Sequence, residues 1–228
     1  MEESIFQSLR GLLLFDDIFL QMQARNIDLV DSYLRDLEKS LLNEYEELER
    51  TPVASATFVS ALSQLWIFGL YELLRTWVQR ASDILKLRAR LHSIRNQPDY
   101  NKQKEKILEQ RFRQSESARA QGATENIIYR QQMIRIVEDE SYGKRLEQSK
   151  KIIIPVYAGL ESLRVNLAKH EVPGAVGSFV FGAGYGRIDT ATGSIYWMVE
   201  QRDGYTSIVS RRELADEIIN LRNRIQAI

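Results

Sequence analysis

Apolar positions recur every three or four residues through the first three quarters of the chain, a period typical of amphipathic helices. The pattern predicts helices over residues 4–24, over 28–50 and from about 54 to 95, the third and longest ending before Pro98. Two more are predicted over 124–142 and 146–171, before Pro173. Residues 1–172 are therefore expected to form a helical bundle.

After Pro173 the period changes from 3.6 to 2, which is typical of strands. Short strands are predicted over 178–181, 184–188, 194–199 and 206–209, with turns over 189–193 and 202–204. Ser210 and Glu213 have the spacing of a capping box, which predicts a terminal helix. The predicted fold class is α+β, predominantly α, with a small antiparallel β-meander and a C-terminal helix packed as a subdomain over 173–228.

The charge balance excludes a protein that coats nucleic acid along its whole surface, because 31 Lys and Arg match 31 Asp and Glu. One segment, residues 86–119, is basic, with ten Lys or Arg against four Asp or Glu. It has two interpretations, a solvated helical hairpin or loop and an arm that contacts RNA. In the second, the nucleic-acid-binding residues would be Lys102, Lys104, Arg111 and Arg113.

The chain has no cysteine, which excludes disulfides, thiol nucleophiles and thiolate metal sites and fits a reducing, cytoplasmic compartment. Glu2 and Glu3 stand where a signal peptide would carry basic residues. The apolar stretch over 65–74 is interrupted by Glu72 and is shorter than the roughly 20 residues of a membrane span. We therefore expect no membrane partner, and no motif for a metal or cofactor is found in the sequence.

Arg164 and His170 are separated by five residues at the end of the last predicted bundle helix, with Asn166 between them. A histidine can transfer protons near neutral pH, and an arginine offers a planar pair of donors to a phosphate. This Arg-x(4–6)-His spacing, late in a helical bundle, resembles the HEPN superfamily of prokaryotic defence and toxin proteins over about residues 28–171. Many members continue the arginine with Asn or Asp, whereas here Val165 follows Arg164 and Asn166 comes one position later.

The resemblance implies a metal-independent endoribonuclease of toxin–antitoxin or antiviral defence type that acts on RNA as a homodimer. Arg164 would bind the phosphate, His170 would transfer protons and Asn166 would position one of them. Glu72 and Arg75, on the long third helix, would support the site by orienting Arg164 or His170. An antitoxin or regulatory protein would be a further partner.

A structural interpretation of the same residues stays open. Arg164 can pair with Glu161 on the helix surface, and His170 can interact with the negative end of the helix dipole. Glu72 and Arg75 would then form a partly buried ion pair. The chain would be a non-catalytic helical protein that dimerises or holds a partner.

Overall fold

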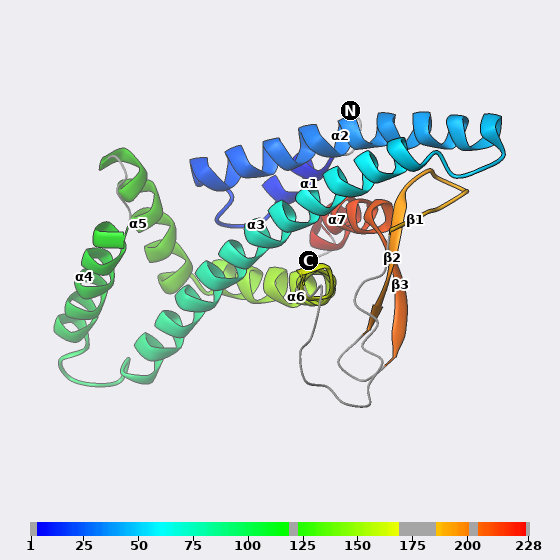
Figure 1. Ribbon diagram of the computed structural model, residues 1–228. Coiled ribbons are helices and arrows are strands. Elements are labelled where there is room, and N and C mark those ends of the chain that lie inside the picture. Colours follow the sequence, from blue (N-terminus) through cyan, green and yellow to red (C-terminus); the bar gives the residue numbers. More distant parts are fainter. Residues whose placement is uncertain (1–3, 119–122, 169–185, 201–204, 227–228) are drawn as a thin grey trace.

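The computed structural model describes residues 4–118, 123–168, 186–200 and 205–226 (Figure 1). Helices dominate, and a small antiparallel sheet precedes the last helix, which confirms the predicted fold class. The elements are α1 (Ile5–Arg10), α2 (Ile18–Leu48), α3 (Val53–Ser93), α4 (Tyr100–Ala118), α5 (Ala123–Glu138), α6 (Glu140–Ala168), β1 (Arg187–Ile188), β2 (Ile195–Glu200), β3 (Thr206–Ser210) and α7 (Arg211–Gln226).

The first helical boundary differs from the prediction of helices over 4–24 and 28–50. The chain leaves the helix after Arg10, and the apolar run that follows forms a buried turn with Leu14 at a φ of 76°. Asp17 then caps α2 by accepting hydrogen bonds from the backbone N–H groups of Phe19 and Leu20, at 3.1 and 3.2 Å. From this cap α2 continues without a break to Leu48, because its inner face stays apolar through the residues predicted to be a loop.

The longest helix, α3, packs along α2 in the opposite direction and continues past it to carry the hairpin of α4 and α5 (Figure 1). Two tryptophans of α3 fix its position through their indole N–H groups. Trp66 donates to the carbonyl of Ile27 at 3.0 Å, and Trp77 donates to the carbonyl of Leu13 at 2.8 Å. The other long helix of the bundle, α6, packs on α3, α5 and α7.

A buried arginine joins α3 to the junction of α5 and α6. The guanidinium of Arg88 donates to the carbonyls of Ile136 and Asp139, at 3.0 and 3.1 Å, and forms an ion pair with Glu140. It fits because Gly143 has no side chain, and a Cβ there would lie 1.9 Å from Arg88 Nη1. The junction therefore lies at Asp139, and α6 begins at Glu140 rather than near residue 146 as predicted.

The sheet has the order β1–β2–β3 with antiparallel pairing throughout, which confirms the meander over these strands. Ile195, Trp197 and Val199 alternate along β2 and are buried in the same core as the helices. Met198 lies opposite Ile208 on the exposed side. The strand predicted over 178–181 and the turn over 202–204 lie outside the described residues.

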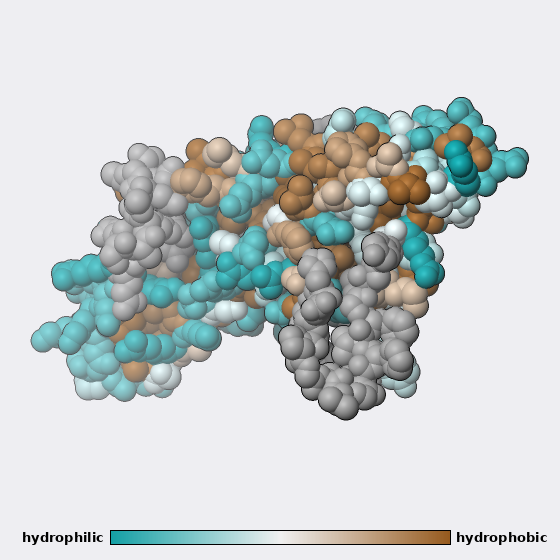
Figure 2. Space-filling view, in the orientation of Figure 1, coloured by the Kyte–Doolittle hydropathy of each residue, from teal (hydrophilic) through white to brown (hydrophobic). Residues whose placement is uncertain are grey.

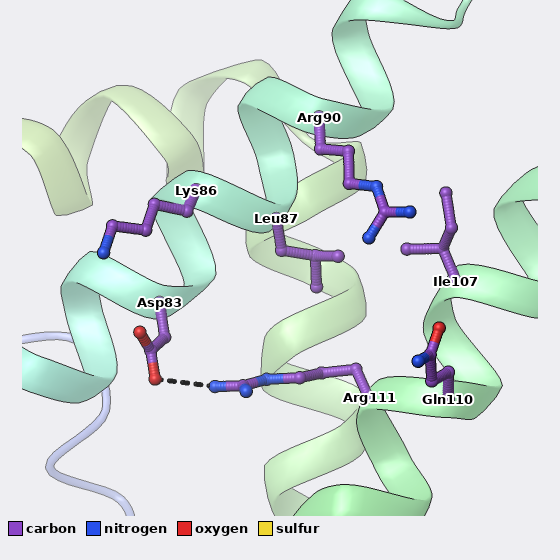
Figure 3. Close-up of a pocket in the computed structure, with 7 residues that line it drawn as sticks. All are labelled: Asp83, Lys86, Leu87, Arg90, Ile107, Gln110 and Arg111. Atoms are coloured by element: carbon purple, nitrogen blue, oxygen red, sulfur yellow. Dashed lines mark hydrogen bonds and ion pairs between the residues drawn. The ribbon is translucent and has the colours of Figure 1, made fainter.

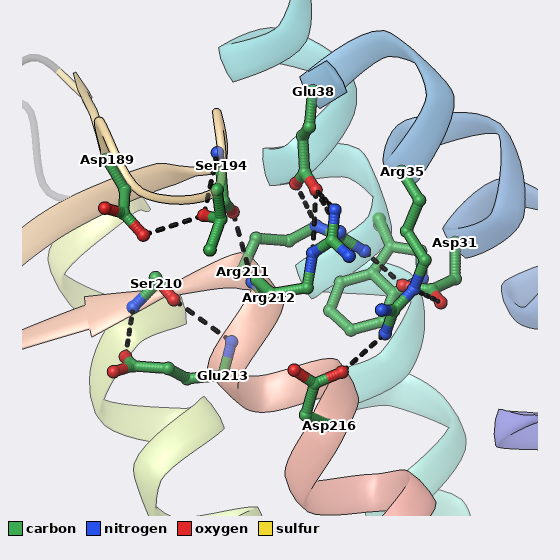
Figure 4. A network of polar contacts seen from close by, with 12 residues as sticks. Asp31, Arg35, Glu38, Asp189, Ser194, Ser210, Arg211, Arg212, Glu213 and Asp216 are labelled. Atoms are coloured by element: carbon green, nitrogen blue, oxygen red, sulfur yellow. Dashed lines mark hydrogen bonds and ion pairs between the residues drawn. The ribbon is translucent and has the colours of Figure 1, made fainter. Parts of the chain in front are cut away.

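The start of α7 is held by a buried network of charges (Figure 4). Ser210 and Glu213 form the predicted capping box, with reciprocal hydrogen bonds of 3.0 and 3.1 Å. Arg211, the first residue of α7, is fully buried, and its Nε and Nη2 each lie 2.7 Å from an oxygen of Glu38 on α2. Its third nitrogen forms an ion pair with Asp31. The network therefore fixes α7 against the middle of α2.

More charges surround this pair. Arg212 also donates to Glu38, and Arg35 bridges Asp31 to Asp216 on α7 at 2.8 and 2.6 Å. Three guanidinium groups thus meet three carboxylates, so the network carries no net charge. The turn before β2 packs against the backbone of Glu38 at Gly193. A Cβ at this position would lie 2.0 Å from the carbonyl oxygen of Glu38, and the φ of +73° also favours glycine.

We predict that Glu38→Gln lowers the free energy of unfolding by about 3–5 kcal/mol, because the guanidinium of Arg211 would stay buried without the charge of Glu38, one of its two carboxylate partners. Urea denaturation followed by circular dichroism measures the change. The matched control is Glu72→Gln, which breaks an ion pair in solvent and should leave the midpoint unchanged. Equal shifts in the two variants would contradict a special role for the buried network.

Candidate functional site

The predicted catalytic residues that the structure describes lie near the C-terminal end of α6. Arg164 is half-buried and its guanidinium carbon lies 4.8 Å from the centre of the Tyr71 ring on α3, within cation–π distance. Asn166 is also half-buried, and its side-chain N–H donates to the carbonyl of Ser162 at 2.8 Å. His170 lies outside the described residues. The structure therefore places Arg164 over an aromatic ring at this end of α6, while the Asn166 amide bonds to the backbone of its own helix.

Tyr71 also stacks on Tyr157 of α6. The ring centres are 5.5 Å apart, the planes differ by 15° and the hydroxyl oxygens lie 3.4 Å apart. Desolvation, followed by the hydrogen bond with Tyr71, raises the pKa of Tyr157 to about 12. Its phenol is therefore neutral near pH 7, which suits a packing contact better than proton transfer.

The supporting pair predicted on α3 forms, but not in the predicted setting. Arg75 Nε and Nη2 each lie 2.7 Å from the same carboxylate oxygen of Glu72, and each side chain is 49% exposed. The expectation of a partly buried ion pair was wrong, because residues 72 and 75 fall on the outward side of α3. Glu72 thus accepts from Arg75, while Arg164 lies over Tyr71.

The basic segment covers the end of α3 and all of α4, with a short turn between them. It is therefore helical on both sides of the turn, as predicted for a helical hairpin. Arg111 pairs with Asp83 of α3 at 2.7 Å, and Arg113 pairs with Glu109 at 2.5 Å. A hydrogen bond to Glu138 of α5 raises the pKa of Lys104. Lys102 is exposed. Most of the cations predicted to bind RNA are therefore already next to carboxylates.

An exposed apolar surface on α2 and α3 was missed in the sequence. On α2 its positions are spaced by three and four residues, and on α3 they are exposed positions in the first half of the helix. Leu29 is 68% exposed and Leu65 is 66% exposed. Figure 2 shows apolar residues gathered over the middle of α2 and the first half of α3. This α2–α3 outer face comprises Phe19, Met22, Asn26, Leu29 and Tyr33 of α2 and Phe58, Ala61 and Leu65 of α3.

The sequence signal for this face is a long stretch without charge. Residues 53–71 contain no Asp, Glu, Lys or Arg, and this stretch begins well before the apolar run over 65–74. By length and composition alone, α3 is the one helix among the described residues that could cross a membrane, although core helices of soluble proteins pass the same test. Only 28% of its most apolar 18 residues are buried. Several of its apolar side chains, such as Phe58 and Leu65, are exposed in a single chain.

Across the described ranges, no three His, Asp or Glu side chains gather as metal ligands would. Comparison with known proteins gives no match to any protein-family model, curated protein or solved structure. The HEPN resemblance stays a prediction.

We predict that Tyr157 contributes stability below about pH 10 that is lost as the pH rises toward 12. The sign follows from the raised pKa: between the two values the unfolded phenol has lost its proton and the folded phenol has kept it, so alkali favours unfolding. Unfolding free energies of the wild type and of Tyr157→Phe, measured from pH 9 to 12, should converge as the pH rises. A constant difference between them would contradict the shifted pKa.

Proposed function

We propose that this chain is a non-catalytic helical interaction protein that forms a homodimer through the α2–α3 outer face. The observation that carries the proposal is the exposure of large apolar side chains on two adjacent helices, such as Leu29 and Leu65. Soluble monomers rarely leave a contiguous apolar surface of this kind open to water, because covering it is favourable by about 25 cal/mol per Å².

The spacing on α2 favours a helix as the occupant of this face. Phe19, Met22, Asn26, Leu29 and Tyr33 follow one another at intervals of three, four, three and four, which is the a/d spacing of a coiled coil. All are exposed. A second copy of α2 has the same row of residues. If a twofold axis passes near Asn26, the two α2 helices run antiparallel and the Phe19 end of one row lies beside the Tyr33 end of the other. A single polar Asn within such a seam is a known device for fixing register.

The neighbouring helix would complete the interface. Trp66 marks the side of α3 that faces α2, since its N–H reaches the Ile27 carbonyl. Leu65 is rotated from Trp66 by about 100° around the helix, and Phe58 falls on the same stripe as Leu65. In the dimer, α2 and α3 from each copy would form a four-helix layer, as in bundles built on a/d contacts.

The contacts at the end of α6 support a structural role for Arg164, which the HEPN resemblance assigns to catalysis. Arg164 of α6 packs on Tyr71 of α3, and Tyr71 stacks on Tyr157 of α6. All three side chains therefore belong to the contact between α3 and α6. Lys104 and Arg111 likewise connect helices through ion pairs. These residues have packing partners that a non-catalytic bundle needs.

We predict that the wild type sediments as a dimer at micromolar concentration and that the double variant Leu29→Glu, Leu65→Glu sediments as a monomer. Burying four unpaired carboxylates per dimer would be costly, whereas in the monomer the new side chains face water. The matched control is Ile208→Glu on β3, whose side chain is 65% exposed and lies on the sheet. It should stay dimeric.

A wild type that stays monomeric across this concentration range would contradict the proposal. So would a double variant that remains dimeric, because the interface would then lie elsewhere. A wild type that floats with neutral phosphatidylcholine vesicles as a monomer would assign the outer face to a membrane instead.

Cleavage of RNA is a second proposal, favoured by Arg164 and Asn166 being half-exposed on the last turns of α6, a few positions before His170 in the sequence. It expects purified protein to cleave total RNA in EDTA, with Arg164→Ala and His170→Ala each slowing cleavage by about 100-fold or more. Cleavage unchanged by both substitutions, or no cleavage above a buffer control, would contradict it.

A further inference from the structure

A cavity of about 280 Å³ lies between the C-terminal part of α3 and the middle of α4 (Figure 3). Leu87 of α3 and Ile107 of α4 form its apolar floor. The guanidinium groups of Arg90 and Arg111 lie on opposite sides of Leu87, and the amide of Gln110 lies beside Ile107 (Figure 3). The cavity thus combines an apolar floor with two groups that recognise anions.

The charges around this cavity favour a negative ligand. Arg111 is held by Asp83 at 2.7 Å, which fixes the direction of its guanidinium. Arg90 is exposed and forms no ion pair with any residue in the described ranges. Lys86 adds another positive charge one turn earlier on α3, although its amine points away from Leu87 (Figure 3). The lining therefore has three cations and one carboxylate.

A second cavity provides a contrast on the other side of α4. Its lining has two acids, Glu105 and Glu109, against two bases, Arg113 and Arg130. Arg113 pairs with Glu109, and the guanidinium of Arg130 lies 4.7 Å from the ring of Phe112. Both cavities are lined by α4, but only the first has a net positive lining. The charges therefore favour an anion in the first cavity and not in the second.

We propose that the cavity between α3 and α4 binds a small organic phosphate, with its apolar part against Leu87 and Ile107 and its phosphate on the guanidinium of Arg90, while Arg111 adds positive charge on the other side of Leu87. A guanidinium presents parallel N–H groups that match two phosphate oxygens, and a charge-assisted hydrogen bond is about twice as strong as a neutral one. The apolar floor would select a phosphate ester over inorganic phosphate. This inference does not depend on the proposed dimer.

Titration calorimetry with phenyl phosphate as the probe tests the site on the full chain. The wild type should bind it saturably, and Arg90→Gln should raise the Kd by about tenfold or more, since one charge-assisted contact is lost. The matched control, Arg113→Gln, alters an exposed arginine of α4 at the other cavity and should leave the Kd unchanged. Circular dichroism checks that both variants are folded.

Two further probes test which part of the ligand is recognised, and one variant tests whether binding is independent of the α2–α3 outer face. Phenol should bind at least tenfold more weakly than phenyl phosphate, because it lacks the anion, and inorganic phosphate should also bind more weakly, because it lacks the apolar part. The Leu29→Glu, Leu65→Glu variant should keep the wild-type Kd. No saturable binding, an unchanged Kd in Arg90→Gln, or equal binding of inorganic phosphate would overturn the proposal.

Discussion

The packing of α7 on α2 depends on one contact, the ion pair of Arg211 with Glu38. Both side chains are fully buried. Removing charged groups from water costs several kcal/mol each, so they remain charged only where partners meet every donor and acceptor. Asp31 and Arg212 supply the remaining partners here. Because each carboxylate of α2 must meet its guanidinium from α7, the network admits one register between these two helices.

That register determines which surfaces stay open. The inner face of α2, which includes Leu20, Ala24 and Ile27, is used by the core. The opposite side of the same helix still carries large apolar residues at coiled-coil spacing. The first half of α3 continues this surface with residues that bear no charge. A single chain therefore pairs the charges of this network but leaves an apolar face uncovered, and in the proposed dimer a second copy of that face would cover it with matching spacing.

Features set by neighbouring residues could be predicted from the sequence. The capping box at Ser210, the meander over β2 and β3 and the extent of α3 follow from local spacing and turn chemistry. The break after Arg10 could not be predicted by periodicity, because its apolar turn residues are buried just as helical ones would be.

Contacts between distant segments were also out of reach. Glu38 and Arg211 are 173 positions apart, and nothing local to either reports the other. Lys104 and Arg111 carried a basic signal in the sequence, but their acidic partners come from other helices. The outer face was hidden for a related reason, since a helix with apolar residues on two sides does not indicate which side the chain itself covers.

The absence of native cysteine allows a direct measurement of the central claim, because a single introduced thiol can pair only with its copy in another chain. In Asn26→Cys the two thiols would lie near the proposed twofold axis, within reach of a disulfide between exposed seams. Mild oxidation of the dilute protein should give a covalent dimer rapidly and nearly completely, whereas Ile208→Cys should stay mostly uncrosslinked. Equal, slow crosslinking of both variants would contradict a dimer built on the α2–α3 outer face.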